Sequence, residues 1–378
     1  MLMKAKKKLA YRSVLTMAAI LLLASCGNGN TAASPSASAA ASPPASASPA
    51  GTAGSGIDWE ARKAENQKAG KITYTTGYFY AASSPDVQAV VARDLGYFEE
   101  LGLDVDVQPG LDSEGMKYLA AGQAQISSAG NPSLVIQSVA SGAGIKGVAT
   151  FGSVGVNAIM VMEDSDIQSP KDLAGKTLGY KGAIPPWVVT MLAADGLDVT
   201  DIKAVSVGYD PRILAGNDLD ALTVFKTNEP YIMEKEGYKT RLIDPGDFGG
   251  ETSFGVVAVN SEFAEAHPTA VEDFLRALSK AHEWVLENPD EAIERMASHS
   301  ETGYDVAAET NRWTVESSLI ADHLPAGQGV AVQTDEQWQR EIDMLVQAKV
   351  IPKALPLEQV MDNAYIDSIY ADGELIWP

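Results

Sequence analysis

Hydrophobic and polar positions follow two alternating periods through most of the chain after residue 70. Short runs of apolar residues predict strands at 71–75, 103–108, 125–128, 145–151, 158–162, 177–180, 204–207, 221–225 and 240–243. Apolar residues three or four apart predict helices at 85–101, 112–121 and 132–141, after a charged helix at 58–69. From Pro268 onward the pattern is mostly helical. Strands alternating with helices are typical of open α/β sheets with helices on both faces.

The first 56 residues do not have this alternation. Five cations lie in residues 1–25, and an uncharged apolar run extends from Val14 to Ala24. Because a helix needs about 20 apolar residues to span a bilayer, the run predicts a secretory signal peptide over residues 1–25. From Gly27 to Gly56 every residue is Gly, Asn, Thr, Ala, Ser or Pro. This composition cannot bury a core, so residues 26–56 are predicted to form a flexible tether.

Charge and composition narrow the function classes. The formal net charge is −22 and the pI is near 4.5, so the surface repels nucleic acid and anionic lipid and neither is expected as a partner. Cys26 is the single cysteine, which excludes intrachain disulfides and cysteine-based zinc sites. The four histidines are scattered and form no H-E-x-x-H pattern. We therefore expect no metal and no cofactor.

One glycine-rich segment and one internal similarity have simple interpretations. Gly142 to Gly147 is a literal G-x-G-x-x-G, but a predicted helix precedes it and a predicted strand follows. A dinucleotide site needs the reverse order, so the segment is interpreted as a loop. Leu119 to Ile126 also resembles Leu214 to Ala221, each a helix end, a glycine and a short strand. This similarity is consistent with two alike lobes, although any αβ unit has the same pattern.

Proline marks four predicted helix starts that follow strands. They are Ser83-Ser84-Pro85, Asn131-Pro132-Ser133, Ile184-Pro185-Pro186 and Asn228-Glu229-Pro230. Proline is favoured in the first helical turn, and Ser or Asn before it caps the helix, so each case alone fits ordinary capping. In open α/β sheets, however, ligands bind beyond the carboxyl ends of strands. All four starts are therefore expected to face one crevice.

Aromatic residues and an acid accompany these turns. The aromatic residues are Tyr78, Phe79, Tyr80, Phe151, Trp187, Phe225 and Tyr231. Several rings beside crevice turns predict walls for a flat ligand, although a single ring is more often part of a core. Glu229 begins a helix, where it fits either a partner for the helix dipole or an acceptor for a ligand amine.

Two resemblances join these features. Leu23-Ala24-Ser25-Cys26 resembles the bacterial lipobox, in which the cysteine becomes the lipidated N-terminus. The body resembles the substrate-binding proteins of ABC importers, in the group that includes nitrate, taurine and alkanesulfonate binders and the thiamine-pyrimidine (NMT1/THI5-like) binders. The matching stretches are ARDLGYFEELGLDV at 92–105, YLAAG at 118–122, SPKDLAGKTLG at 169–179, LDA at 219–221, NEPY at 228–231 and NPDEA at 288–292.

The resemblance implies a two-lobe periplasmic-binding-protein-like fold of type II, with two open α/β sheets joined by a two-strand hinge. Residues 57–156 and 258–378 are expected to form the first lobe and residues 157–257 the second. The crossings are expected near Val156–Met162 and Phe254–Asn260. The partners implied are a small-molecule ligand and ABC permease subunits, with the membrane reached only through the lipid on Cys26. We expect a monomer outside the cytoplasm.

The expected ligand is a small flat N-heterocycle, thiamine-pyrimidine-like or a related ring. The residues expected to contact it are Tyr78, Phe79, Tyr80, Ser83, Asn131, Phe151, Lys181, Trp187, Asn228, Glu229 and Tyr231. An alternative is an alkanesulfonate, taurine or nitrate anion held at helix N-termini, with Lys181, Arg212 or Lys226 as counter-charges. A pyrimidine-synthase-like enzyme is disfavoured, because no histidine lies near a crevice turn and no Cys-rich segment is present. A sensory lipoprotein with the same clamp is a further alternative.

Overall fold

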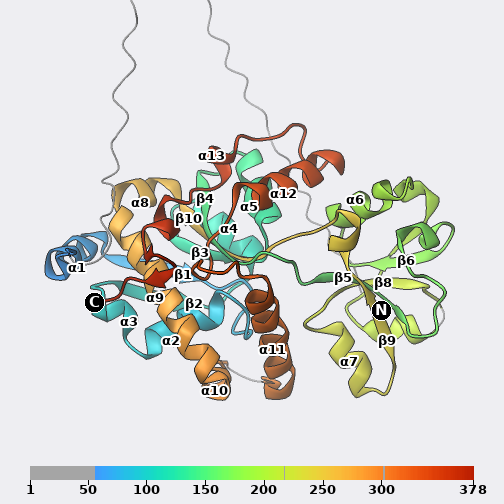
Figure 1. Ribbon diagram of the computed structural model, residues 1–378, viewed down its shortest axis with the longest axis horizontal. Helices are drawn as coiled ribbons and strands as arrows, with labels where there is room; N and C mark the ends of the chain where they lie inside the picture. The colour runs from blue at the N-terminus through green and yellow to red at the C-terminus, as the bar shows by residue number, and fades with distance from the viewer. Residues whose placement is uncertain (1–55, 217, 301–302) are drawn as a thin grey trace, which may run out of the picture. The chain divides into compact units, whose positions relative to one another are not determined.

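The computed structural model describes residues 56–216, 218–300 and 303–378. These residues form two five-stranded sheets and a two-stranded hairpin (Figure 1). The signal peptide predicted over 1–25, the predicted lipid site Cys26 and the tether up to residue 55 lie outside the described residues. Within those residues, no helix has the length and apolar character needed to cross a membrane.

The first sheet has the order β2-β1-β3-β10-β4. Strands β1, β2 and β3 are parallel, whereas β10 runs antiparallel to both of its neighbours. The bounds are β1 (Lys71–Thr75), β2 (Asp104–Gln108), β3 (Ile126–Ala129), β4 (Ile145–Gly152) and β10 (Phe254–Asn260). Strand β3 is buried throughout, and Gly130 just after it accepts a hydrogen bond from the Gly255 backbone N–H at 3.2 Å.

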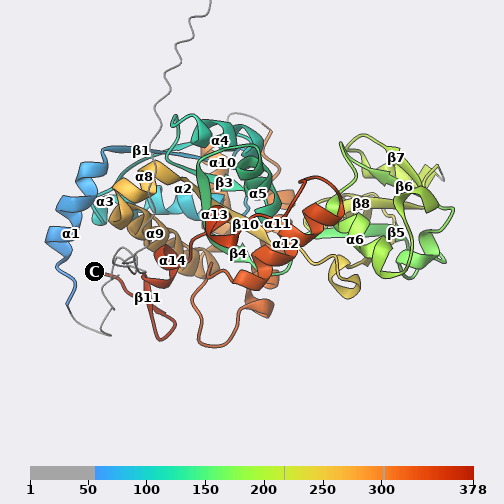
Figure 2. The same ribbon diagram turned by 90° about the horizontal axis from the view of Figure 1, so that it is seen from above.

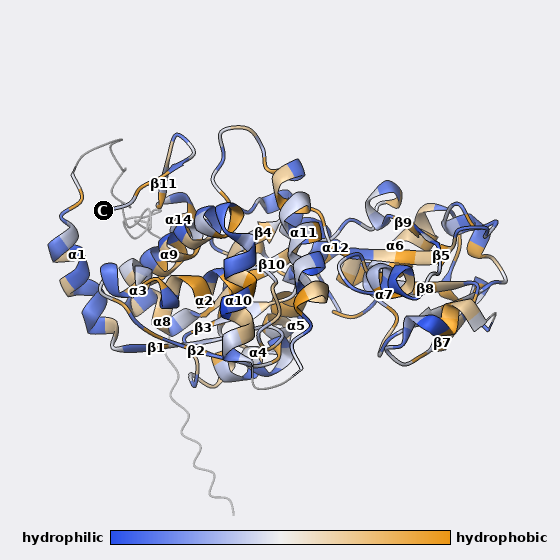
Figure 3. Ribbon diagram, turned by 90° about the horizontal axis from the view of Figure 1, so that it is seen from below, coloured by the Kyte–Doolittle hydropathy of each residue, from blue (hydrophilic) through white to orange (hydrophobic). Residues whose placement is uncertain are grey.

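The second sheet repeats this plan with the order β7-β6-β8-β5-β9. Here β6 is parallel to β7 and β8, and β5 is antiparallel to β8 and β9. The bounds are β5 (Asn157–Met162), β6 (Thr177–Tyr180), β7 (Lys203–Ser206), β8 (Ala221–Phe225) and β9 (Thr240–Ile243). Figure 3 colours β5 mostly as hydrophobic, in keeping with the complete burial of Ala158, Ile159, Met160 and Val161.

The two sheets are equivalent position by position, which confirms the predicted two-lobe α/β fold. In each sheet the fourth strand is the antiparallel one, and it belongs to the segment that enters or leaves the second lobe. The internal similarity found in the sequence falls on equivalent strands, because one copy leads into β3 and the other into β8. The glycine-rich segment 142–147 joins α5 to β4, as expected for a loop.

Helices cover both sheets. The first lobe has α1 (Trp59–Asn66), α2 (Asp86–Asp94), α3 (Tyr97–Glu100), α4 (Asp112–Ala120), α5 (Pro132–Ala140), α8 (Ser261–Ala266), α9 (Pro268–Glu287), α10 (Pro289–His299), α11 (Val306–His323), α12 (Asp335–Gln347), α13 (Leu357–Val360) and α14 (Ala364–Asp367), with the hairpin β11 (Tyr370–Ala371) and β12 (Glu374–Leu375). The second lobe has α6 (Pro186–Ala194) and α7 (Glu229–Lys235), with short 3₁₀ turns at Pro170–Leu173, Val199–Asp201, Pro211–Gly216 and Pro245–Phe248. The helix predicted over 85–101 is divided into α2 and α3 at Gly96, whose φ of 77° ends the first segment.

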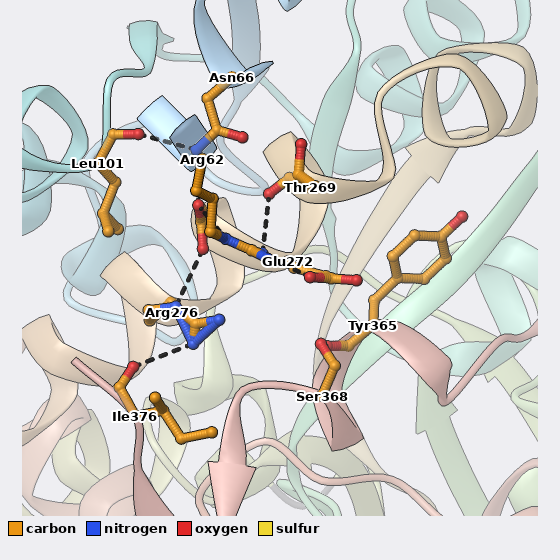
Figure 4. A network of polar contacts seen from close by, with 10 residues as sticks. Arg62, Asn66, Leu101, Thr269, Glu272, Arg276, Tyr365, Ser368 and Ile376 are labelled. Carbon is orange, nitrogen blue, oxygen red and sulfur yellow. Dashed lines mark hydrogen bonds and ion pairs between the residues drawn. The ribbon is translucent and has the colours of Figure 1, made fainter. Parts of the chain in front are cut away.

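A buried ionic network fastens α1 to the first lobe (Figure 4). Asp273 on α9 accepts hydrogen bonds from Arg62 Nε at 2.7 Å, Asn66 Nδ2 at 2.6 Å and Arg276 Nε at 3.0 Å. Arg276 also donates to the Ile376 carbonyl oxygen at 3.0 Å. The network therefore joins the start of the described chain, the long helix α9 and the C-terminal segment.

The predicted crossing strands are corrected by the structure. Strand β5 pairs on both sides within the second sheet, and β10 pairs on both sides within the first, so neither strand passes between lobes. The connections are instead the short segments 153–156 and 244–253, and the second sheet ends before Phe254. Lys226 Nζ joins the two segments by bonds to Gly155 O at 2.9 Å and Asp244 Oδ2 at 2.5 Å.

Helix α12 provides a third link, which the sequence did not predict. It packs against α5 of the first lobe and extends to α6 of the second (Figure 2). Trp338 is buried in a first-lobe cluster, whereas Met344, less than two turns later, is buried in the second-lobe core. Thr190 Oγ1 on α6 donates to Gln347 Oε1 at 3.0 Å.

Candidate functional site

A cavity of about 380 Å³ lies between the lobes at the carboxyl ends of several strands. Its wall includes the turns after β1, β3, β6, β7 and β8, together with the second connection and one face of α11. A larger cavity of about 510 Å³ lies within the first lobe between α9, α11 and the C-terminal hairpin. Only the smaller cavity is lined by both lobes, as a site that closes around a ligand requires.

Six of the eleven residues predicted to contact a ligand line this cavity. They are Tyr78, Ser83, Asn131, Lys181, Asn228 and Glu229. Three of the four proline-marked helix starts therefore meet here, those of α2, α5 and α7. Asn131 caps α5 as expected, because its side chain accepts a hydrogen bond from the Leu134 backbone N–H at 3.1 Å.

The other five residues do not line this cavity. Trp187 is 5% exposed in the second-lobe core, and Phe151 is 4% exposed in the first-lobe core beside the His282 ring. Tyr80 packs toward His299, Tyr231 lies under Lys235, and Phe79 is exposed outside the cavity wall. Two of the rings at turns, Phe151 and Trp187, thus belong to the cores of the lobes.

Two buried carboxylates shape the first-lobe wall of the cavity. Asp86, at the first turn of α2, accepts hydrogen bonds from the Tyr74 hydroxyl at 2.7 Å and the Gly77 backbone N–H at 2.9 Å. Glu316 on α11 accepts from Ser83 Oγ at 2.6 Å and the Ser84 backbone N–H at 2.9 Å. Burial raises the pKa of Asp86 to about 6 and that of Glu316 to about 7. These bonds fix the loop from Gly77 to Ser84 against α11.

The second-lobe wall contains a buried ion pair. Glu229, the first residue of α7, is 1% exposed, and its Oε2 accepts a hydrogen bond from the Phe225 backbone N–H at 2.8 Å. Its Oε1 is paired with Lys181 Nζ, which follows β6. Burial lowers the pKa of Lys181 to about 8. The Glu229 carboxylate is therefore already bonded within the protein, whereas the sequence suggested it as an acceptor for a ligand amine.

Two exposed rings flank the Lys181 ammonium group. Its Nζ lies 5.9 Å from the centre of the Tyr209 ring and 5.8 Å from that of Phe225, within the range of a cation–π contact. Tyr209 is 82% exposed and Phe225 is 47% exposed, so each has a face free of protein. A carboxylate with two aromatic rings suits an ammonium or aromatic amine.

Several residues of the wall were missed by the sequence interpretation. Tyr209 precedes Pro211 in a turn after a strand, the same signal that marked the other helix starts, so it could have been found. Arg312 and Glu316 lie on α11, far along the chain from the strands they face. Nothing in their local sequence separates them from the exposed charges of an ordinary helix.

The described residues offer no group of three or more His, Cys, Asp or Glu side chains placed to hold a metal ion. Arg312 lines the cavity but is paired with Glu309 at 2.9 Å on the same helix. The cavity therefore presents hydrogen-bonding groups, aromatic faces and carboxylates, which suit binding of an organic molecule.

Comparison with known proteins places this geometry in a family. Residues 87–292 match the family described as NMT1/THI5 like. A formylaminopyrimidine-binding protein of Halalkalibacterium halodurans is 27% identical over 263 residues, which span 68% of this chain and 79% of that protein. A 4-amino-5-hydroxymethyl-2-methylpyrimidine phosphate synthase of Legionella pneumophila is 21% identical over 292 residues, or 75% of this chain and 89% of that protein.

A solved structure has the same fold. The periplasmic aliphatic sulphonate binding protein SsuA from Escherichia coli superposes with a TM-score of 0.61 at 17% identity. The match covers 76% of this chain and 91% of that one. At this identity the likeness concerns the arrangement of the two lobes.

Proposed function

This chain belongs to the NMT1/THI5-like family, and on that premise we propose that it is the extracytoplasmic solute-binding protein of an ABC importer. It captures a small flat N-heterocycle that carries an amino group and delivers it to a permease. The ligand lies in the cavity between the lobes, against Tyr78, Tyr209 and Phe225. A binding role is favoured over catalysis because the cavity wall has no histidine and no cysteine among the described residues.

The charge of the cavity wall favours a ring that donates N–H groups over an anionic ligand. Lys181 and Arg312 are the cations among the described residues of the wall, and each is paired with an acid. The acids of the wall are Asp86, Asp112, Glu229 and Glu316. Above about pH 7, where Asp86 and Glu316 lose their protons, an anion at about 4 Å from either carboxylate would meet a repulsion of about 4 kcal/mol at an effective dielectric constant near 20. A ring that donates N–H groups would instead find acceptors.

The exposed rings support a flat ligand. Tyr78 is 60% exposed on the first lobe, and Tyr209 and Phe225 line the same cavity from the second. Stacking on such rings contributes about 0.5–1.5 kcal/mol beyond the area that it buries. Closure of the lobes over a ring would cover all three side chains, with the segments 153–156 and 244–253 as hinge.

A thermal-shift panel tests the proposed ligand class. Formylaminopyrimidine, 4-aminopyrimidine, ethanesulfonate and nitrate are each titrated into the protein. A ligand at 100 times its Kd adds about 2.7 kcal/mol of stability. We expect the aminopyrimidines to raise the melting temperature and the two anions to leave it unchanged. Stabilisation by ethanesulfonate or nitrate alone would instead favour the anion-binding alternative, with the ligand at the start of α5.

Membrane attachment through Cys26 is part of the proposal. It rests on the sequence Leu23-Ala24-Ser25-Cys26 and on the uncharged tether that follows. A tether of about 30 residues has a root-mean-square reach on the order of 30 Å, which keeps a binding protein near a permease. Cys26→Ser is expected to release the protein from the membrane fraction. Unchanged fractionation of this variant would contradict the anchor.

A further inference from the structure

We propose that Lys181 is a resident occupant of the subsite for the ligand's amino group, held there by Glu229, Tyr209 and Phe225 until a ligand displaces it. The inference rests on the proposed function, since it concerns the same cavity. Lys181 would compete with the ligand's amino group for Glu229. This competition would set the affinity for the ligand and exclude molecules that are weak hydrogen-bond donors. In the sequence interpretation Lys181 was a direct ligand contact or a counter-charge for an anion.

The three partners of the Lys181 ammonium group resemble a recognition site for a cation. One side is the Glu229 carboxylate, and two other sides are the Tyr209 and Phe225 rings at 5.9 and 5.8 Å. Ammonium groups are bound in this way by aromatic rings and an acid in many proteins. Both rings are exposed, Tyr209 by 82% and Phe225 by 47%, although they contact a buried ion pair. This exposure is what a ring surface awaiting a ligand requires.

Glu229 is the fixed member of the pair. It is 1% exposed at the first residue of α7, and its second oxygen is bonded to the Phe225 backbone N–H at 2.8 Å. Moving the carboxylate would leave that N–H unpaired and would disturb the start of the helix. A ligand therefore meets Glu229 in its present place and must take over Oε1.

Lys181 is the movable member. Its ammonium group is carried by a flexible four-carbon side chain that follows β6, and Gly182 comes next with a φ of 68°. In the described part of the chain, Nζ makes no hydrogen bond besides that to Glu229. The side chain can thus rotate toward solvent when a competing donor arrives, at the loss of a single polar partner.

Because Lys181 occupies the subsite, a ligand must displace it in order to bind. A ligand's apparent Kd equals its intrinsic Kd divided by the fraction of molecules in which the subsite is free. A ring amine can replace the ammonium group at Glu229, whereas a sulfonate at that position would face the carboxylate. Removing the lysine side chain should therefore strengthen binding of an amine and give no advantage to an anion.

The test is calorimetric titration of the full chain with formylaminopyrimidine and with ethanesulfonate. Lys181→Met is the main variant, and Lys181→Gln is a milder second one that retains a donor for Glu229. Lys235→Met is the matched control, because Lys235 also lies over a ring, that of Tyr231 at 5.6 Å, but not in the cavity wall. We expect formylaminopyrimidine to bind Lys181→Met about tenfold more tightly than the parent protein. Lys181→Gln should show a smaller gain and Lys235→Met none.

The outcomes separate this inference from the proposed function. If the parent binds formylaminopyrimidine and both Lys181 variants bind it equally or more weakly, the displacement is wrong and the proposed function stands. If the parent binds ethanesulfonate and Lys181→Met abolishes that binding, Lys181 is an anion contact and both proposals are overturned. Binding of neither probe by any of the proteins would also overturn both.

Discussion

Two buried ion-pair regions of this protein differ in what surrounds them. In the first lobe, Asp273 receives hydrogen bonds from Arg62, Asn66 and Arg276, and the Asp273 and Arg276 side chains are each 1% exposed (Figure 4). In the second lobe, Glu229 pairs with Lys181 alone, at the wall of a cavity. The carboxylate of the first region is surrounded by three protein donors, whereas that of the second lies at the wall of a cavity.

The difference separates a structural role from a binding role: the enclosed charges hold parts of the fold together, whereas the accessible pair lies where a ligand can reach it. Arg276 keeps its charge although burial lowers its pKa to about 10, because Asp273 and the Ile376 carbonyl oxygen both bind it. Such a network secures α1 and the C-terminus to α9. Lys181 has one acidic partner and two exposed rings, so another donor can take its place. A charged group at a cavity wall, with partners that a ligand can replace, indicates a binding site; burial of a charge by itself does not.

Breaking the enclosed network should have the largest effect. Asp273→Asn keeps the size of the side chain but leaves Arg62 and Arg276 without their shared carboxylate. Removal of one member of a buried ion pair typically costs about 3–5 kcal/mol, and we expect a loss of that size in the free energy of unfolding. Urea denaturation measures it. The control is Glu283→Gln, which breaks an exposed pair with Lys280 and should cost about 0–1 kcal/mol. A loss below about 1 kcal/mol for Asp273→Asn would contradict the structural role.

A buried carboxylate that has hydrogen bonds but no cation sharpens the comparison. Glu341 on α12 accepts hydrogen bonds from Ser133 Oγ and from the Ser253 backbone N–H, and burial raises its pKa to about 7. The folded state thus holds a proton that the unfolded state releases at lower pH. The stability that this proton provides is present at acid pH and is lost as the pH rises through about 7.

Glu341→Gln should remove this pH dependence. Because one pKa unit corresponds to about 1.4 kcal/mol, the variant should gain about 2 kcal/mol relative to the parent between pH 5 and pH 8. Urea unfolding of both proteins at the two pH values measures the change. Comparing the variant with the parent cancels the effect of the strongly acidic surface. Parallel pH profiles for the two proteins would show that Glu341 does not titrate in this way.

Breaking the accessible pair should cost less stability than breaking the enclosed one. Lys181→Met leaves Glu229 without its cation, but the carboxylate retains the Phe225 N–H and can bind cavity water. We expect a loss of about 1–2 kcal/mol in the free energy of unfolding. A loss as large as that of Asp273→Asn would mean that the pair is structural, and would argue against its displacement by a ligand.

The comparison also explains how far the sequence could be used for prediction. The strands at 71–75, 177–180, 221–225 and 240–243 have the predicted bounds, because their apolar runs end at clear turn residues. Alternation of strands and helices, with the resemblance to a binding-protein family, predicted the two lobes. These features depend on neighbours in sequence, where periodicity is informative.

The candidate site depended on contacts between distant segments. Lys181 and Glu229 were each predicted to contact a ligand, but their pairing joins two turns that are 48 residues apart and follows from the sheet order. Trp187 was predicted as a wall of the crevice, yet it is 5% exposed and belongs to the second-lobe core. Glu316 and Glu341 come from C-terminal helices whose contacts no local pattern indicates.

The central claim is that Glu229 accepts a hydrogen bond from a ligand amine in the cavity between the lobes. Calorimetric titration of the parent and of Glu229→Gln with formylaminopyrimidine tests it most directly. Glu234→Gln, an exposed change on the same helix, is the control. A charge-assisted hydrogen bond contributes about 1.5–3 kcal/mol, so Glu229→Gln should weaken binding about tenfold or more, while Glu234→Gln leaves it unchanged. Equal or tighter binding of formylaminopyrimidine by a folded Glu229→Gln variant would contradict the claim.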